Sequence, residues 1–279
     1  MRYASFRRPD GTPAFGRLAA GNIVDLAGHG GPASLRAALA AGTLATLPDG
    51  RSYAAAEVAL LPVIPEPGKI LCVGLNYETH RQETGRRQAA YPAIFTRWAD
   101  TLVAAGAPLI RPRETERFDY EGELAVIIGT GGRRIPRDRA LAHVAGYSIF
   151  NDASVRDWQG HNSQFTPGKN FPSTGALGPA LVTADEIPDL AAQRITTRLN
   201  GSVVQDQPIA DMIWDVAAII EYLSTFTALA PGDVIATGTP GGVGDRRTPP
   251  LYMQGGDLVE VAIGVIGTLS NPVIDDPQP

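Results

Sequence analysis

The stretch FDYEGELAVIIG, residues 118–129, has the composition of a buried strand, yet it carries Glu121 and Glu123 two positions apart. Side chains two apart along a strand point to the same face of the sheet. Two carboxylates on one face repel each other, and burial increases that cost. Two interpretations are open: an edge strand that exposes its acids to water, or a cation that bridges the two carboxylates.

Composition is typical of a folded protein with a sizeable core, since 44% of the 279 residues are hydrophobic and 19% are charged. The net charge is −5 and the charges are interspersed, so we expect no nucleic-acid partner. No run approaches about 18 apolar residues and no signal-peptide core is visible, so we expect no membrane association. The single cysteine, Cys72 in KILCVGL, predicts a buried thiol and a cytoplasmic location.

The 31 glycines and 23 prolines predict many short strands joined by turns. Residues 1–65 are expected to form a small N-terminal α+β domain, with strands in RYASF, FGRLAAGNIVDL and EVALLPVI. A helix is predicted in SLRAALAAG, with Ser34 as its N-cap. The proline-rich segment 62–69 marks the boundary with a catalytic domain over residues 66–279.

The second unit is rich in Val and Ile segments bounded by Gly or Pro, as strands are. Asn200 and Gly201 separate two of these segments and predict a two-residue hairpin turn. One helix is predicted over residues 211–226, where apolar residues recur at helical spacing. Regular alternation of strands and helices is missing, so the sequence predicts a β-rich α+β fold.

Common cofactor signatures are absent from the sequence. The glycine-rich GTPGGVG, residues 238–244, lacks dinucleotide-binding spacing, and no P-loop, H-E-x-x-H or G-x-S-x-G occurs. Four histidines and one cysteine make a zinc site improbable. Asp152, at the exit of the strand in YSIFNDASVRDWQ, can join Glu121 and Glu123 around a hard cation. Such an oxygen-only set suits Mg²⁺ or Mn²⁺, with Ca²⁺ possible.

A series of motifs in fixed order resembles the fumarylacetoacetate hydrolase family. The resemblance covers about residues 68 to 273, and residues 1–65 resemble the family's small N-terminal domain only loosely. The motifs are GLNYETHRQE (74–83), DYEGELAVIIG (119–129), GYSIFNDASVRDWQ (146–159), GKNF (168–171), GPALVT (178–183), TRLNGSVVQD (197–206), PGDVIATGTPGGVG (231–244) and GDLVEVAIGVIGTLSNPV (256–273).

The resemblance implies a mixed β-sandwich roll with short flanking helices, assembled as a homodimer. It implies a metal site at Glu121, Glu123 and Asp152, which favours the bridging cation over the edge strand. It also implies catalytic roles for His80, Glu83 and Lys169, and substrate contacts from Arg156, Gln159 and Thr239.

The spacing of these residues adds detail. His80 and Glu83 are three apart, so one helical turn brings them within hydrogen-bonding reach. A carboxylate orients an imidazole and raises its basicity, so the pair can take a proton from water. The polar segment from Asn76 to about Tyr91 is expected to form a mobile lid that carries the pair.

Arg156 and Gln159 follow Asp152 at i+4 and i+7, on one helical face if the segment coils. The resemblance implies that Lys169 stabilises an oxyanion. Pro172 stands where many family members have aspartate, and its loop is expected to line the pocket. The roles of Arg97, Trp98 and Tyr91, in a distinctive segment that can shape the site, are left open.

The function expected from the resemblance is divalent-metal-dependent hydrolysis of a carbon–carbon bond in a 1,3-dicarbonyl oxo acid of the acylpyruvate or fumarylpyruvate type, through a metal-held enolate. The alternative is an oxaloacetate-type decarboxylase, or a 2-hydroxydienedioate isomerase or hydratase, in aromatic catabolism. A non-catalytic binding protein is disfavoured, because it has no need for the His80–Glu83 pair and Lys169.

Overall fold

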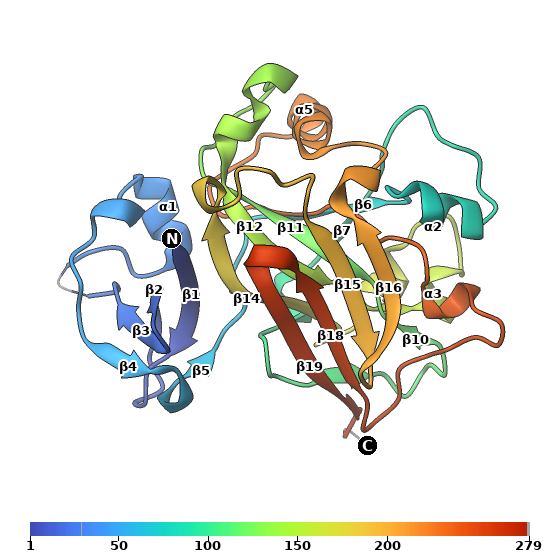
Figure 1. Cartoon of the computed structure of the whole chain (residues 1–279), viewed down its shortest axis with the longest axis horizontal. Coiled ribbons are helices and arrows are strands. Elements are labelled where there is room, and N and C mark those ends of the chain that lie inside the picture. The colour runs from blue at the N-terminus through green and yellow to red at the C-terminus, as the bar shows by residue number, and fades with distance from the viewer. Residues whose placement is uncertain (29, 278–279) are drawn as a thin grey trace.

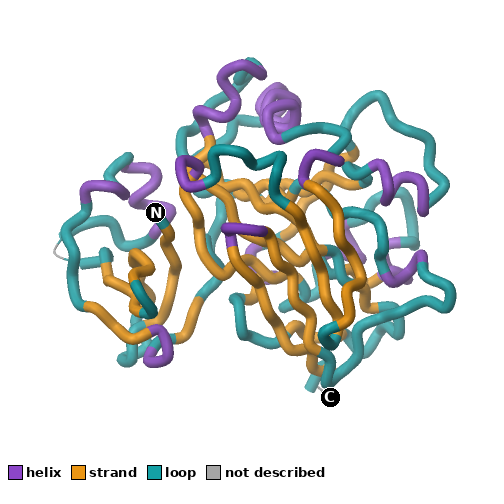
Figure 2. The backbone as a smooth tube through the Cα atoms, viewed as in Figure 1, coloured by secondary structure: helices purple, strands orange, loops and turns teal. Residues whose placement is uncertain are grey.

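The computed structural model describes residues 1–28 and 30–277, and it shows two β-sheets with short helices around them (Figures 1 and 2). The large sheet has the order β4 (Ser52–Ala54), β3 (Asn22–Asp25), β2 (Pro13–Ala19), β1 (Arg2–Arg7), β14 (Gly175–Thr183), β12 (Val144–Asn151), β11 (Gly122–Ile128), β17 (Val234–Ala236), β6 (Ile70–Gly74) and β7 (Ala93–Arg97). Two further strands extend it, β5 (Ala59–Leu60) beside β1 and β8 (Leu102–Val103) beside β14.

The second sheet has the order β16 (Ser202–Pro208), β15 (Arg194–Leu199), β18 (Leu258–Ile263), β19 (Gly267–Asp275) and β9 (Leu109–Arg111), and a small ribbon pairs β10 (Phe118–Asp119) with β13 (Ser154–Val155). The α-helices are α1 (Leu35–Ala41), α2 (Glu78–Glu83), α3 (Arg156–Gln159), α4 (Thr166–Lys169) and α5 (Val216–Phe226). Short 3₁₀ turns span Leu44–Thr46, Ala55–Glu57, Ala99–Thr101, Arg137–His143, Ala184–Glu186, Ile209–Asp211, Gly244–Arg246 and Gly264–Ile266. The β-rich α+β fold expected from the sequence is confirmed.

Strand β11 is buried on both faces. Leu124 and Val126 belong to the core that includes residues of the second sheet, whereas Ala125 and Ile127 pack into a cluster with Leu35 of α1. The strand lies between β12 and β17, so both edges are also paired. The edge-strand interpretation of Glu121 and Glu123 is therefore wrong, because β11 is an interior strand of the sheet and both glutamates are buried.

The N-terminal strands continue the large sheet. β1 pairs with β14 through Arg2 opposite Val182 and Tyr3 opposite Leu181. In Figure 1 these strands and α1 lie to one side of the main body. Between β5 and β6, Val63 and Ile64 are fully buried. One hydrogen-bonded sheet thus runs through both parts of the chain, and their division into separately folding domains stays a prediction.

The short-range predictions have mixed outcomes. Ser34 caps α1, since its side chain accepts a hydrogen bond from the Ala37 amide at 3.1 Å. Asn200 and Gly201 form the predicted hairpin turn between β15 and β16, with φ of 51° and 80°. The segment EVALLPVI contributes only the two-residue strand β5, because residues 55–57 form a 3₁₀ turn before it.

The helix predicted over residues 211–226 begins at Val216 instead. The Asp215 side chain accepts from the Ala218 amide at 2.8 Å and so caps the helix there. The preceding residues are held outside the helix, because the Trp214 amide donates to Asn76 Oδ1 at 2.8 Å and Met212 forms a bridge with Tyr77. Long-range contacts to the segment before α2 override the helical spacing of residues 211–215.

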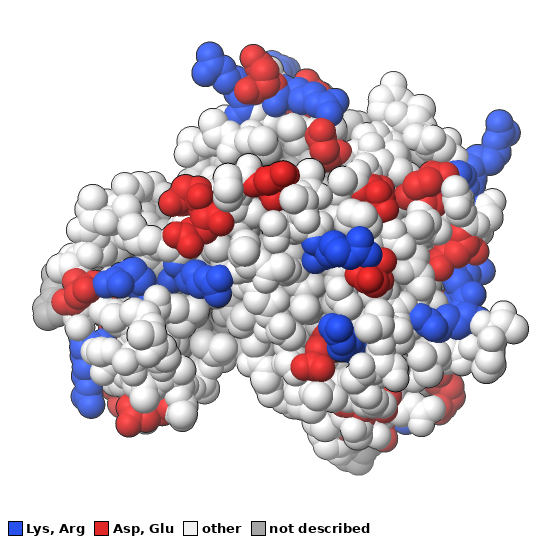
Figure 3. All heavy atoms as spheres, in the orientation of Figure 1, with Lys and Arg blue, Asp and Glu red and all other residues white. Residues whose placement is uncertain are grey.

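The surface carries no dominant field of one sign on the face that Figure 3 draws, where acidic and basic side chains are interspersed. None of the helices in the described ranges, 1–28 and 30–277, is long and apolar enough to cross a membrane.

Gly122, between the two glutamates, lies in close contact with the second sheet. A Cβ at this position would lie 2.2 Å from Thr197 Oγ1 and 2.9 Å from Val261 Cγ1 of the second sheet. The alternation of strand side chains explains this arrangement: Glu121 and Glu123 point to one face, and the residue between them points to the other. Glycine is required here so that the second sheet can pack against the strand that carries the carboxylates.

We predict that Gly122→Ala lowers the free energy of unfolding by about 1–3 kcal/mol, since an added methyl group overpacks the contact between the sheets. Thr197→Ala should recover part of that loss in the Gly122→Ala background, because it removes the nearest atom. Urea unfolding of the single and double variants measures this coupling. Strictly additive losses would contradict the close-approach explanation.

Candidate metal centre and active site

Three buried carboxylates meet at neighbouring strand ends. Glu121 immediately precedes β11, Glu123 lies within it, and Asp152 immediately follows β12. The Asp152 amide donates to the Glu121 carbonyl at 2.8 Å, which fixes the two strand ends together. One oxygen from each side chain lies within 4.8 Å of the others. The residues are 5%, 2% and 0% exposed, respectively, so the cluster is shielded from bulk water.

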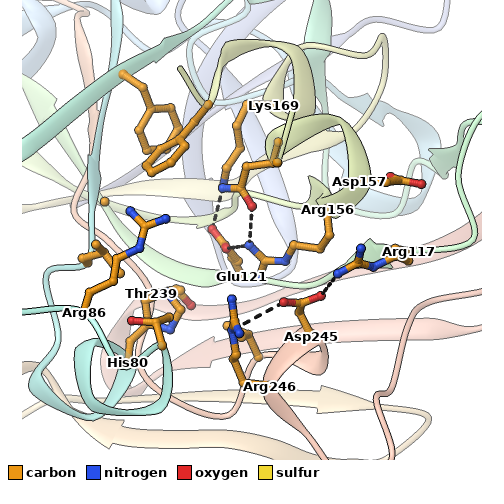
Figure 4. Close-up of a pocket in the computed structure, with 18 of the residues that line it drawn as sticks. His80, Arg86, Arg117, Glu121, Arg156, Asp157, Lys169, Thr239, Asp245 and Arg246 are labelled. Carbon is orange, nitrogen blue, oxygen red and sulfur yellow. Dashed lines mark hydrogen bonds and ion pairs between the residues drawn. The ribbon is translucent and has the colours of Figure 1, made fainter. Parts of the chain in front are cut away.

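Three cations surround the carboxylates. Lys169 Nζ, at the end of α4, lies 2.6 Å from Glu121 Oε2 and 2.5 Å from Asp152 Oδ2, and its residue is 1% exposed. Arg97 Nη1 lies 2.7 Å from Asp152 Oδ1. Arg156 Nη1 lies 2.6 Å from Glu121 Oε1. Figure 4 shows Lys169 and Arg156 both reaching the Glu121 carboxylate, Lys169 from above and Arg156 from the right of the view.

The two glutamates differ in their partners and in their pKa values. Burial tends to raise the pKa of Glu121, but the charges of Lys169 and Arg156 hold it at about 2. Glu123 has only the Gly238 amide as a hydrogen-bond partner in the described residues, at 2.8 Å from Oε2. Burial, followed by the nearby charges of Asp152 and Glu121, raises the Glu123 pKa well above its ordinary value. Glu123 is therefore the carboxylate that most needs a positive partner.

The cluster fits a hard divalent cation. Counting the buried Asp119 that pairs with Arg156, four carboxyl groups face three cationic side chains, so an ionised Glu123 has no cationic side chain of its own among the described residues. The donors are all oxygen, and Glu123 Oε1 has no hydrogen-bond partner in ranges 1–28 and 30–277. This is the ligand chemistry of Mg²⁺ and Mn²⁺, and Ca²⁺ also takes oxygen ligands.

The His80–Glu83 pair forms as its spacing predicts. Both residues lie on α2, where His80 Nδ1 is 2.6 Å from Glu83 Oε1. Glu83 Oε2 accepts from the Gly242 amide at 2.8 Å, and the Gly241 amide donates to Thr79 Oγ1 at 3.0 Å. The glycine-rich loop 238–244 therefore positions α2, and His80 Nε2 has no hydrogen-bond partner within the described part of the chain.

The expected lid is firmly attached at its start. Asn76 is fully buried, and its Nδ2 donates to the Thr237 carbonyl at 2.7 Å and the Trp214 carbonyl at 3.0 Å. Residues 85–91 are exposed, and Tyr91 stacks on Tyr222 of α5 with ring centroids 6.0 Å apart. An opening motion therefore cannot begin at Asn76 without breaking buried hydrogen bonds, and the mobility of the later residues stays a prediction.

The substrate-contact residues from α3 line the same cavity as the carboxylates. Arg156 Nη1 donates to Gln159 Oε1 at 2.9 Å, while Arg156 Nη2 is buried without a partner in the part of the chain described. The helix begins at Arg156, so the proposed helical face that includes Asp152 is wrong: the end of β12 positions Asp152. An orphaned buried donor beside a cavity indicates a place for a ligand acceptor.

Thr239 also borders the cavity, but its hydroxyl already makes two hydrogen bonds within the protein. Thr239 Oγ1 donates to the Gly122 carbonyl at 2.9 Å and accepts from Gln205 Nε2 at 2.8 Å. The hydroxyl thus ties the glycine-rich loop to the strand that carries the glutamates. A ligand contact through this oxygen would require one of these bonds to lengthen.

Sequence reasoning misplaced or missed several residues. The loop at Pro172, expected to line the pocket, does not do so there, because Pro172 is exposed and absent from the cavity lining. Trp98 and Tyr91, whose roles the sequence leaves open, are 56% and 68% exposed and are also absent from the lining. Arg97 is 2% exposed and holds Asp152, a role that its position in IFTRW did not reveal. Asp119 was missed although it opens the motif DYEGEL; it is fully buried and binds Arg156 Nε at 2.8 Å.

The cavity that joins these groups has a volume of about 730 Å³. Its wall contains the His80 imidazole, two of the three clustered carboxylates, Lys169 and Arg156, together with aromatic rings from Phe95 and Phe165. Acid–base, cationic and anionic groups thus face one solvent-connected space, which is the arrangement of an enzyme active site.

The fold and this site are those of an enzyme family whose members depend on metal ions. The model of the fumarylacetoacetate (FAA) hydrolase C-terminal domain matches residues 69–274. The chain belongs to the fumarylacetoacetate hydrolase family.

Relatives in sequence carry the name oxaloacetate tautomerase. The Bacillus subtilis protein is 41% identical over 226 residues, covering 79% of this chain and 75% of that protein. The mitochondrial protein of Xenopus laevis is 40% identical over 220 residues, covering 78% of this chain and 69% of that protein.

Solved structures of similar fold carry other names. The 2-hydroxyhepta-2,4-diene-1,7-dioate isomerase of Mycobacterium marinum has a TM-score of 0.83 and 33% identity, with both chains covered fully. The fumarylacetoacetate hydrolase of Exiguobacterium antarcticum has a TM-score of 0.86 and 37% identity, covering 99% of this chain and 100% of that one.

We predict that Mn²⁺ or Mg²⁺ stabilises the protein through the carboxylate cluster. At free cation a hundredfold above Kd, the free energy of unfolding should rise by about 2.7 kcal/mol. Glu123→Gln should abolish this increase without lowering the stability of the cation-free protein, since the amide removes a buried charge that its neighbours repel. Chemical unfolding with and without cation measures both effects.

Glu116→Gln is the matched control for the cation experiment, because the Glu116 side chain is 87% exposed and lies outside the cluster. This variant should retain the full cation-induced stabilisation. Equal stabilisation of the Glu123→Gln variant would contradict the assignment of the site.

Proposed function

We propose that the protein is a divalent-cation-dependent enzyme that interconverts the keto and enol forms of a 2-oxo dicarboxylic acid of the oxaloacetate class. The observation that carries the proposal is the His80 imidazole, held by Glu83 in the cavity that also contains Glu121, Glu123 and Lys169. The names of the sequence relatives and of the isomerase neighbour support proton transfer over the carbon–carbon hydrolysis expected from the sequence.

The cation, held by Glu121, Glu123 and Asp152, would supply Lewis-acid polarisation of the substrate's oxo group. His80 Nε2 takes the proton from the carbon next to the oxo group; the electron pair of the broken C–H bond forms the carbon–carbon double bond, and the π pair of the carbonyl moves to its oxygen. Return of the proton to that oxygen gives the enol, so atoms and charge balance. Glu83 stabilises the imidazolium that forms between the two transfers.

The other cavity residues would position the acid. Arg156 Nη2, the buried donor without a partner in the described residues, suits a carboxylate oxygen of the oxo-acid end. Lys169 places a positive charge beside the oxygen that becomes negative. The same proton transfer over a conjugated chain would isomerise a 2-hydroxydienedioate. Assembly as a homodimer remains a prediction, which sedimentation equilibrium would check.

Hydrolysis of an acylpyruvate-type carbon–carbon bond is the second candidate. An imidazole oriented by a carboxylate can also take a proton from water, and one structural neighbour is a fumarylacetoacetate hydrolase. The two candidates differ in products, because only hydrolysis releases two acids from one substrate. Assays of the Mg²⁺-loaded enzyme with oxaloacetate and with acylpyruvates distinguish them directly.

We predict that His80→Ala lowers the rate of oxaloacetate tautomerisation by about 10²–10⁴-fold, since that is the usual contribution of a positioned general base. Glu83→Gln should act in the same direction. Decarboxylation of oxaloacetate should fall much less, because it needs no proton abstraction from carbon. Loss of enol absorbance measures tautomerisation, and calorimetry should show unchanged Mn²⁺ affinity.

His161→Ala is the matched control, because His161 lines the same cavity but packs against Trp158 in a tilted ring contact and has no carboxylate partner in the described chain. It should leave the tautomerisation rate unchanged. A His80→Ala variant with the wild-type rate would show that the assigned proton-transfer role is wrong.

A further inference from the structure

Two arginines of the cavity wall have no role in the site described so far. Arg86 lies in the loop after α2, and Arg246 ends the 3₁₀ turn that follows the glycine-rich loop. In Figure 4 both lie on the side of the view that carries His80, and Lys169 lies across from them. They are therefore placed to meet the part of a bound molecule that extends away from Lys169.

Their guanidinium groups have few close ion-pair or hydrogen-bond partners within the described residues. Arg86 makes no ion pair there, and its Cζ lies over the Phe165 ring, 5.7 Å from the centroid. Arg246 Nε lies 3.4 Å from Asp245 Oδ2, longer than the usual 2.7–2.9 Å of a charge-assisted hydrogen bond. Asp245 Oδ1 is bound more closely by Arg117, at 2.5 Å, so Arg246 is the weaker of its two partners.

Two other arginines near the site, by contrast, have several close protein partners. Arg81 contacts both oxygens of Glu78, at 2.7 and 2.5 Å. Arg247 binds Tyr120 Oη at 2.9 Å and the Val204 carbonyl at 2.6 Å. Each of these side chains is held by protein oxygens, whereas Arg86 and Arg246, which line the cavity and are exposed, have no such set of close partners in the described residues.

Guanidinium groups that lack close protein acceptors favour the binding of a planar anion. A guanidinium offers paired N–H groups that match the two oxygens of a carboxylate. The protein as a whole has a net charge of −5, and the two arginines place positive charge at this part of the cavity wall, where it attracts an anion. The cavity of about 730 Å³ falls in the range of drug-sized ligands and leaves room beyond a short oxo-acid end.

We propose that Arg86 and Arg246 bind the second carboxylate of a 2-oxo dicarboxylic acid whose oxo-acid end reaches Glu121, Glu123 and Asp152. The inference rests on the proposed function and deepens it by assigning the residues that select the second carboxylate, so that diacids are preferred over monoacids of equal length. Because a four-carbon acid fills little of the cavity, the preference extends to diacids with a longer chain.

Matched pairs of acids test the proposal by binding alone. Calorimetry on the Mg²⁺-loaded enzyme compares 2-oxoglutarate with 2-oxopentanoate, and 2-oxoadipate with 2-oxohexanoate, so that each pair differs only in the terminal carboxylate. Each diacid should bind about tenfold or more tightly than its monoacid, as expected for hydrogen bonds to a charged group. Arg86→Gln and Arg246→Gln should each reduce diacid affinity and leave monoacid and oxalate affinity unchanged.

Arg87→Gln is the charge-matched control, because Arg87 is adjacent to Arg86, exposed and outside the cavity lining. It should leave all affinities unchanged. Equal affinity for diacids and monoacids, or an equal loss in the Arg87→Gln variant, would overturn the inference while the proposed function stands. If none of the four acids binds, the proposed function fails, and this inference fails with it.

Discussion

Repulsion between Glu121 and Glu123 is the constraint on which the rest of the site depends. The two side chains share one face of a strand that is buried on both faces and paired on both edges. The protein compensates for Glu121 with Lys169 and Arg156 and for Asp152 with Arg97, but it leaves Glu123 with one backbone amide. A divalent cation at the cluster would give Glu123 the positive partner that the described side chains do not supply.

Supporting structure extends from this centre in two directions. On one side, Gly122 lets the second sheet approach, and Thr239 fastens the glycine-rich loop to the Gly122 carbonyl. On the other side, the same loop binds Glu83 through the Gly242 amide and thereby orients His80. The His80 imidazole and the carboxylate cluster are thus connected through a short series of hydrogen bonds, which is the rigidity that the proposed proton transfer at a fixed carbon would require.

The sequence was sufficient where the information is local or periodic. The strand period places Glu121 and Glu123 together, the i,i+3 spacing pairs His80 with Glu83, and Asn200-Gly201 makes its hairpin turn. Prediction failed where partners are distant in sequence: Arg97 is 55 residues from Asp152, and Asp119 is 37 residues from Arg156. The start of α5 was misplaced for the same reason, since Asn76 holds Trp214 across 138 residues. Such contacts follow from the fold and have no spacing signal.

The most direct measurement of the central claim is anomalous diffraction from crystals soaked in Mn²⁺. If a cation binds at the cluster, one strong peak is expected at about 2.0–2.3 Å from carboxylate oxygens of Glu121, Glu123 and Asp152, the range for oxygen ligands of small divalent cations. Lys169 should then have given up at least one of its two carboxylate contacts. A fully soaked crystal with no peak at these oxygens, and with Lys169 still bridging Glu121 and Asp152, would contradict the claim.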